Sequence, residues 1–83
     1  MRDGDLILVK WRDITTQEGW QTKEALANME LPIIMSPGIF ISEDEKYLRI
    51  ANDLSPDGSC NGTVFPLGCV EEIWELSVGK RIR

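Results

Sequence analysis

The stretch FPLGCVEEIWEL, residues 65–76, decides how the whole chain folds. Its glycine–cysteine step could present a nucleophilic Cys69 in a turn, or it could open the last strand of a small sheet. A nucleophilic cysteine needs a lowered pKa, commonly from a histidine base or a cationic helix start. The chain has no histidine, and Glu71 and Glu72 follow the cysteine. We therefore expect Cys69 to be a small, semi-buried residue after a tight turn at residues 66–68.

Apolar alternation before this stretch predicts a series of strands. Residues 5–13, DLILVKWRD, place three apolar side chains on one face, which we expect to lie against the core. These are Ile7, Val9 and Trp11. Further strands are predicted over residues 31–42, 47–54, 63–65 and 70–76, and the first of them should bend at Ser36-Pro37-Gly38 because proline removes a ladder donor and glycine bends a strand.

A short helix is predicted between the first two strands. Thr22 precedes a partly apolar segment, and Pro32 follows it, so the helix should run over residues 23–30. Five short strands with one helix predict a mostly β protein that closes its edges as a small, partly open five-stranded barrel. This arrangement, with a 3₁₀-like turn before the last strand, resembles SH3-like and Sm-like barrels.

Length and charge limit the classes of partner. The 83 residues suit one domain, expected at residues 1–76 with a short basic tail at 77–83. The net charge of −5 argues against an extended nucleic-acid partner, which needs clustered Lys and Arg. Apolar runs are too short to span a membrane, and the start MRDGDLILVKW is unlike a signal peptide, so we expect a cytoplasmic protein.

The residue types exclude most catalytic and metal chemistry. Without histidine, no nucleophile–base pair can be assigned, so we expect no enzyme, no catalytic residues and no cofactor. Cys60 and Cys69 are expected as free thiols and are too few for a zinc site. The stretch NDLSPDGSCNGTV resembles a calcium loop only in part, because Val64 stands where a bidentate glutamate is needed. We therefore expect no metal.

Aromatic residues give the strongest indication of a binding surface. Trp11 is expected mainly in the core, whereas Trp20 either caps the barrel or lines a groove. Tyr47 and Arg49 share one strand face with Ala51, which predicts a polar–aromatic surface suited to stacking a base or a peptide. The candidate ligand-binding residues are Trp11, Arg12, Trp20, Lys46, Tyr47 and Arg49.

The end of the last strand is the predicted interface. If Val70 and Ile73 face the core, Trp74 points outward beside Glu75. Exposed aromatic residues supply much binding energy from few contacts. We therefore expect Trp74 and Leu76 to take part in self-association.

Several of these stretches together resemble small uncharacterised proteins of bacteriophage and prophage genomes. The likeness runs through VKWRD with GW after it, GIFISEDEKYLRIA, and FPLGCVEEIWEL. It covers most of residues 7–76 and marks a barrel frame rather than an active site. The residues that carry it are Trp11, Asp13, Gly19, Trp20, Gly38, Glu43, Asp44, Pro66, Gly68, Ile73 and Leu76.

The resemblance implies a class of roles in the cytosol of a bacterial host. Small phage proteins of this size often block host proteins or, as oligomers, sequester nucleotide signals of host defence. We therefore expect a non-enzymatic, oligomeric binding module whose ligand is a host defence protein or a small nucleotide signal. The alternative is a structural or assembly adaptor without a small-molecule ligand, in which the tryptophans serve only core and interface.

Overall fold

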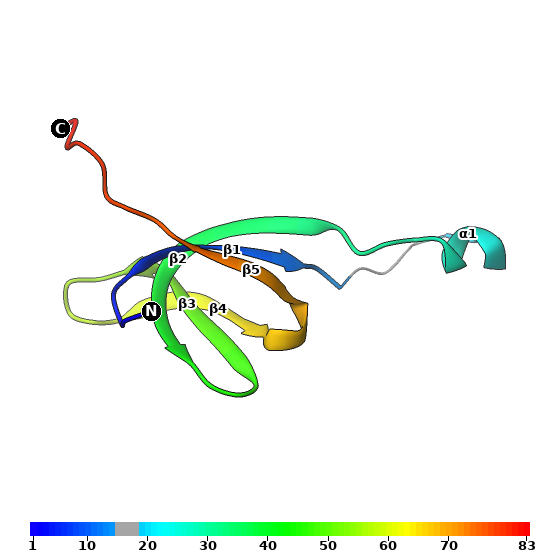
Figure 1. Ribbon diagram of the computed structural model, residues 1–83, viewed down its shortest axis with the longest axis horizontal. Helices are drawn as coiled ribbons and strands as arrows, with labels where there is room; N and C mark the ends of the chain where they lie inside the picture. The colour runs from blue at the N-terminus through cyan, green and yellow to red at the C-terminus, as the bar shows by residue number, and fades with distance from the viewer. Residues whose placement is uncertain (15–18) are drawn as a thin grey trace.

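The computed structural model describes residues 1–14 and 19–83. Its main element is a single antiparallel sheet of five strands in the order β4-β3-β2-β1-β5 (Figure 1). Within the described residues β4 and β5 do not pair, so the sheet is open. The mostly β prediction is confirmed. The elements are β1 (Leu6–Arg12), α1 (Lys23–Ala27), β2 (Ile33–Glu43), β3 (Tyr47–Leu54), β4 (Cys60–Pro66), the 3₁₀ turn η1 (Leu67–Cys69) and β5 (Val70–Glu75).

The long strand β2 joins the two halves of the sheet. Its first part pairs with β1, from Ile33 to Ile39, and its last part pairs with β3, from Ile39 to Glu43. The register shifts between Phe40 and Ser42, a few residues after the predicted bend. Gly38 permits a close approach there, because a Cβ at this position would lie 2.6 Å from Ile50 Cδ1. β2 therefore lies over β3, and the sheet curls around its core.

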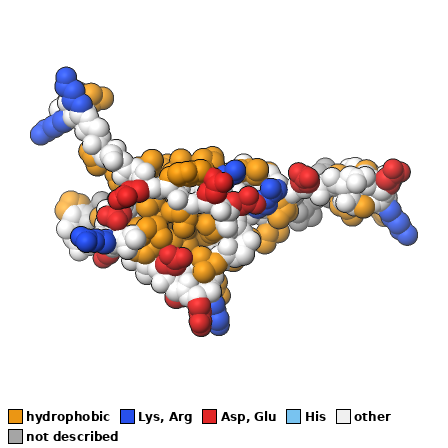
Figure 2. Space-filling view, in the orientation of Figure 1, with side chains coloured by type: hydrophobic (Ala, Val, Ile, Leu, Met, Phe, Trp, Pro, Cys, Tyr) orange, Lys and Arg blue, Asp and Glu red, His pale blue; other side chains and the backbone are white. Residues whose placement is uncertain are grey.

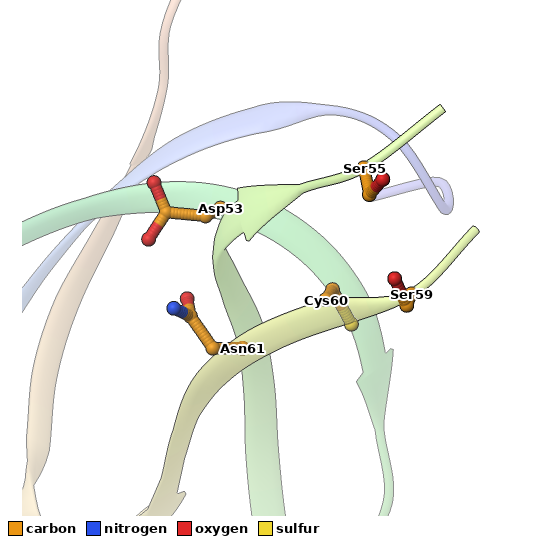
Figure 3. Close-up of a pocket in the computed structure, with 5 residues that line it drawn as sticks. All are labelled: Asp53, Ser55, Ser59, Cys60 and Asn61. Atoms are coloured by element: carbon orange, nitrogen blue, oxygen red, sulfur yellow. The ribbon is translucent and has the colours of Figure 1, made fainter. Parts of the chain in front are cut away.

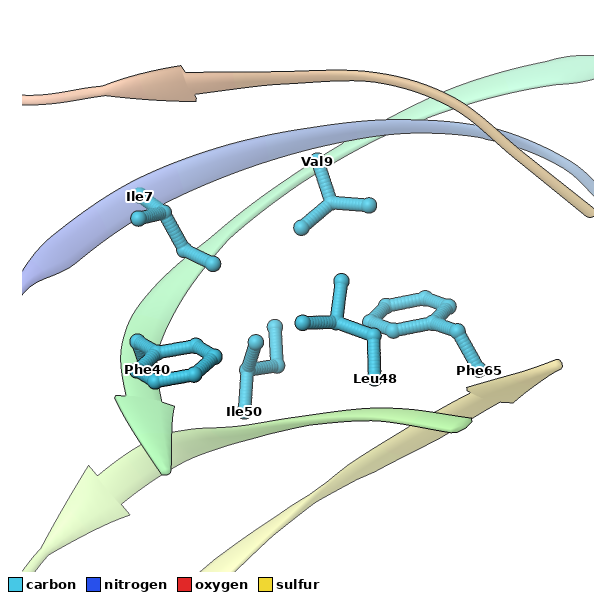
Figure 4. Close-up of a cluster of buried hydrophobic side chains, with 6 residues drawn as sticks. All are labelled: Ile7, Val9, Phe40, Leu48, Ile50 and Phe65. Atoms are coloured by element: carbon cyan, nitrogen blue, oxygen red, sulfur yellow. The ribbon is translucent and has the colours of Figure 1, made fainter. Parts of the chain in front are cut away.

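The core lies inside this curl. Ile7 and Val9 point from β1 toward the side chains of β3 and β4 (Figure 4). Trp11 is partly buried at the edge of this group, and its ring meets that of Phe65 edge-on at 5.1 Å. The inward face predicted for the first strand is therefore confirmed. The buried cluster consists of Ile7, Val9, Phe40, Leu48, Ile50 and Phe65.

Two predicted element bounds were wrong. The helix ends at Ala27 with Asn28 as its C-cap, well before Pro32, although Thr22 caps its start by accepting a hydrogen bond from the Ala25 amide at 3.0 Å. β4 begins at Cys60 rather than at residue 63. Glycine is rare in strands, but Gly62 belongs in this one because a Cβ would lie 2.0 Å from the Ile50 carbonyl oxygen.

An irregularity in β5 accounts for its unusual spacing of core residues. Val70 and Ile73 both pack against the core although they are three residues apart. The register between β1 and β5 shifts at Lys10/Trp11, where Lys10 pairs with Glu72 and Trp11 with Val70. Glu71 is the extra residue of this bulge, and it lets Val70 and Ile73 face the same side of the sheet.

Two segments leave the sheet. α1 and its flanks form an arm on one side, and residues after Leu76 form an extended tail on the other (Figure 1). The radius of gyration is 16.4 Å, against about 12 Å for a compact chain of this length. The difference reflects the arm and the tail, which add length without adding core.

Candidate functional site

The predicted ligand-binding residues do not form one group. Trp11, the first of them, stabilises the fold. Besides its contact with Phe65, Trp11 donates a hydrogen bond from Nε1 to Ser36 Oγ at 2.9 Å. This bond satisfies the indole N–H where the ring is part-buried, as is usual for tryptophan. Trp11 thus ties β1 to β2 and to the core.

Arg12 is held by two neighbours. Its Nε donates to Glu71 in the bulge of β5, and its Nη1 lies 3.4 Å from the carbonyl oxygen of Leu31. The hydrogen bond and the charge of Glu71 raise the pKa of Arg12 above its ordinary value. The guanidinium therefore connects β1, β5 and the root of the arm.

Tyr47 and Arg49 do lie together, at the turn between β2 and β3. The Arg49 guanidinium carbon lies 5.4 Å from the centre of the Tyr47 ring, and its Nη1 donates to Asp44 Oδ2 at 2.9 Å. The amides of Lys46 and Tyr47 both donate to Asp44 Oδ1 at 2.8 Å. These donors lower the pKa of Asp44, with the two backbone amides contributing most. The carboxylate organises the turn and forms an ion pair with Arg49.

Ala51 adds nothing exposed to this surface, because it is only 1% exposed. The pairing of β3 with β4 is regular from Tyr47 to Ala51, so the predicted alternation holds. Ala51 is covered because it lies between Ile39 of β2 and Gly62 of β4.

Trp20 lies apart from every other candidate. It is fully exposed, at 102%, just before α1, so it neither caps the sheet nor lines a groove. Lys46 lies at the other end of β2, in the turn before β3, where its carbonyl accepts from the Leu67 amide at 3.0 Å. The candidate set therefore falls into the arm, the end of β1 and the β2–β3 turn.

The predicted interface residues Trp74 and Leu76 belong to a wider exposed apolar surface whose other members were not predicted from the sequence. On the side of β2, β1 and β5 opposite the core, apolar residues pair directly across strands: Leu8 is opposite Pro37 on one side and Trp74 on the other. Directly paired residues share a face of a sheet. We call this surface the outer face, and it comprises Leu6, Leu8, Ile33, Met35, Pro37, Ile39, Trp74 and Leu76.

Much of the outer face is open to solvent. Ile33 is 47% exposed, Met35 48% and Trp74 41%. The prediction that Trp74 points outward while Val70 and Ile73 face the core is confirmed. Lys10 and Glu72 are paired within the face and form part of its polar border. Period-2 patterns in β1 and β2 contain the signal, because the outward positions of both strands are largely apolar as well.

A shallow depression lies elsewhere, at the hairpin between β3 and β4 (Figure 3). It has a volume of about 250 Å³ and is lined by Asp53, Ser55, Ser59, Cys60 and Asn61. Asp57 organises the adjoining turn, since the hydroxyl and amide of Ser59 both donate to it and lower its pKa. Over residues 1–14 and 19–83, no group of three or more Cys, Asp or Glu side chains is placed to hold a metal.

Comparison of the chain with protein-family models, with curated proteins and with solved structures finds no match. No helix in the described part of the chain is long and apolar enough to cross a membrane.

Proposed function

We propose that this chain is a non-enzymatic binding module that recognises a protein partner through the outer face, on an SH3-like or Sm-like frame. The frame is supported by the strand order β4-β3-β2-β1-β5, by β2 pairing with β1 at its start and β3 at its end, and by the 3₁₀ turn between β4 and β5. An SH3-like domain of this size has little interior space for a ligand, so it would bind its partner on its surface.

The exposed apolar row across three strands is the observation that carries this proposal. Pro37, Leu8 and Trp74 lie side by side, with Met35 and Ile33 exposed next to them. Contiguous exposed apolar surface of this kind marks protein interfaces, and an aromatic residue with a methionine is a common interface composition.

A protein partner fits the side chains better than a small nucleotide does. A nucleotide phosphate needs a cation that is free to bind it, and Arg12 and Arg49 are each paired with a carboxylate. These carboxylates offset the positive charge that would attract a phosphate. The outer face instead presents apolar groups that another protein can bury.

The resemblance to phage proteins adds that the partner is a protein of the bacterial host, such as one of its defence proteins. An assembly adaptor would use the same outer face for another component of its own particle. The identity of the captured partner separates these two roles.

The test is photo-crosslinking from the outer face in a bacterial cell. A photoreactive residue replacing Met35 should form one dominant adduct, identified by mass spectrometry, and the purified partner should then bind the unmodified chain. Met35→Glu should weaken that binding by at least about tenfold, since it puts a charge into the apolar contact.

Val64→Glu is the matched control. Val64 is an exposed apolar residue on β4, away from the outer face, so this variant should bind the partner like the parent chain. Equal binding by Met35→Glu and the parent would contradict the proposal. A rise in melting temperature with adenosine nucleotides, abolished by Arg49→Ala, would favour a nucleotide ligand instead.

A further inference from the structure

The tail continues the strand pattern of β5 beyond the point where its own sheet ends. After the bulge, Trp74 and Leu76 lie on the outer face, and the same alternation places Val78, Lys80 and Ile82 on that side. Val78 is 83% exposed and Ile82 95%. β-branched residues at alternate positions are typical of a strand, so the tail has a strand sequence without a partner strand.

The backbone of β5 offers pairing groups along its free edge. The Leu76 amide donates to the Leu6 carbonyl oxygen at 2.9 Å, so Leu76 directs its backbone groups toward β1. In an antiparallel sheet neighbouring residues direct these groups to opposite edges. Glu75 and Ser77 therefore present theirs to the other edge, where no strand of the described residues pairs with β5.

β5 is acidic and the tail that follows it is basic. β5 carries Glu71, Glu72 and Glu75, whereas the tail carries Lys80, Arg81 and Arg83. Blue side chains cluster at the tip of the tail in Figure 2, and red ones lie over the sheet. An antiparallel second copy would bring each basic tail beside the acidic strand of the other.

We infer that two copies of this chain pair antiparallel along β5 and the tail, with a two-fold axis at Leu76. This register places Leu76 opposite its own copy, Trp74 opposite Val78, and Glu72 opposite Lys80. Glu75 and Ser77 then form the hydrogen-bonded pair, in agreement with the edge to which their backbone groups point. The same contacts occur twice, as two-fold symmetry requires.

Neighbouring registers are less favourable. A shift by one residue would set outer-face side chains opposite residues of the other face and misalign the hydrogen-bonding groups. A shift by two residues in one direction sets Glu75 opposite Glu75, and in the other it sets Trp74 opposite Lys80 and Glu72 opposite Ile82. The register centred on Leu76 sets Glu71 and Glu72 opposite Arg81 and Lys80, whereas the last of these shifts keeps one pair of opposite charges, Glu71 with Arg83.

The dimer goes beyond the proposed function, because it adds a second copy rather than a different partner. Directly paired residues share a face, so both outer faces lie on the same side of the joined sheet. Two binding surfaces would then act together on a partner that is itself repeated.

Light scattering on the purified chain tests this pairing first. We expect a mass of twice the 9.4 kDa of one chain. Lys80→Glu lies in the exposed tail, where it leaves the fold intact, and should weaken dimerisation by about tenfold or more because two attractive pairs become repulsive. Arg83→Glu is the matched control, since it makes the same charge change outside the paired stretch and should keep the dimer.

Mixing variants tests the register itself. Glu72→Lys should weaken its own dimer as Lys80→Glu does, but an equal mixture of the two variants should form a heterodimer with restored affinity. Leu76→Cys, with Cys60 and Cys69 changed to serine, should give a disulfide-linked dimer under mild oxidation, since non-hydrogen-bonded pairs bring Cα atoms to about 4.5 Å. Ser77→Cys should crosslink much less.

Three results would overturn the inference: a single-chain mass at all concentrations, a mass above two chains, or equal weakening by Lys80→Glu and Arg83→Glu. A larger assembly would indicate head-to-tail pairing of β5 with β4. The dimer and the proposed function fail separately, because Met35→Glu lies two strands away from the paired edge and should leave the dimer mass unchanged.

Discussion

The sheet and the arm of residues 19–32 both contain large apolar side chains, but only the sheet buries them. In the sheet, Leu48 and Phe65 are at most 1% exposed, whereas in the arm Leu26 is 57% exposed and Trp20 fully so. α1 buries none of its residues. Large apolar side chains are therefore buried where strand pairing holds them in register against residues distant in the chain.

The largest effect expected from this contrast is at Phe65. Phe65→Ala should lower the free energy of unfolding by ~3–5 kcal/mol, since it removes a ring packed against Trp11 in the core. Leu26→Ala in the arm should change it by less than ~0.5 kcal/mol. Urea denaturation followed by tryptophan fluorescence measures both. If Phe65→Ala prevents folding altogether, Phe65→Leu replaces it and should lower the free energy of unfolding by ~1.5 kcal/mol or less. Similar losses of free energy for the Phe65 and Leu26 variants would contradict the contrast between sheet and arm.

Two glycine substitutions test the close packing of the sheet and should have a smaller effect on stability than Phe65→Ala. Gly62→Ala should destabilise by ~1–3 kcal/mol, because its Cβ would meet the Ile50 carbonyl at 2.0 Å and one strand must move. Gly68→Ala adds the same methyl group where nothing lies within 4 Å, and should be close to neutral. Thermal unfolding by circular dichroism compares them. Equal melting temperatures would show that β4 does not lie this close to β3.

The β2–β3 turn should make stability depend on pH. Because its hydrogen bonds lower the folded-state pKa of Asp44, the carboxylate stabilises the fold above its ordinary value, about 3.9, and this contribution is lost as pH falls through the lower folded value. Asp44→Asn should therefore melt lower than the parent chain at pH 7, with the difference shrinking toward pH 3. Glu45→Gln, in the same turn, should show a smaller difference at pH 7.

The smallest effect should come from the helix cap in the arm. Thr22→Ala removes the acceptor of the Ala25 amide, so hydrogen exchange at Ala25 should accelerate. Global unfolding should not change, because the arm adds nothing to the core. Thr22→Ser keeps the hydroxyl and should retain the slower exchange. A lower melting temperature for Thr22→Ala would mean that the arm folds together with the sheet.

The sequence predicted those parts of the fold that alternation defines locally. β3 was predicted over residues 47–54 and runs over Tyr47–Leu54. The start of β4 was missed because glycine at position 62 argues against a strand until the Ile50 carbonyl beside it is known. Likewise, Val70 and Ile73 face the same way only because β5 bulges against Lys10 and Trp11, which no local pattern indicates.

The candidate site was harder to predict for the same reason. Arg12 and Glu71 lie 59 residues apart in sequence, so nothing local shows that one cation is already paired. The outer face likewise depends on which residues of three strands are opposite one another, and Leu8 meets Trp74 only through the register of β1 with β5. The outward orientation of Trp74 was predicted only on the condition that Val70 and Ile73 face the core, and the bulge against Lys10 and Trp11 meets that condition.

The pairing of Leu6 with Leu76 has a mechanical consequence. β1 and β5 are antiparallel neighbours, and the Leu76 amide bonds to the Leu6 carbonyl where the chain enters and leaves the sheet. A force that pulls the two ends of the chain apart therefore acts first on the hydrogen bond between Leu6 and Leu76. The remaining hydrogen bonds between β1 and β5 then break one after another, whereas a shearing force would load all of them together. The sheet should therefore yield at low force when it is pulled from its two ends.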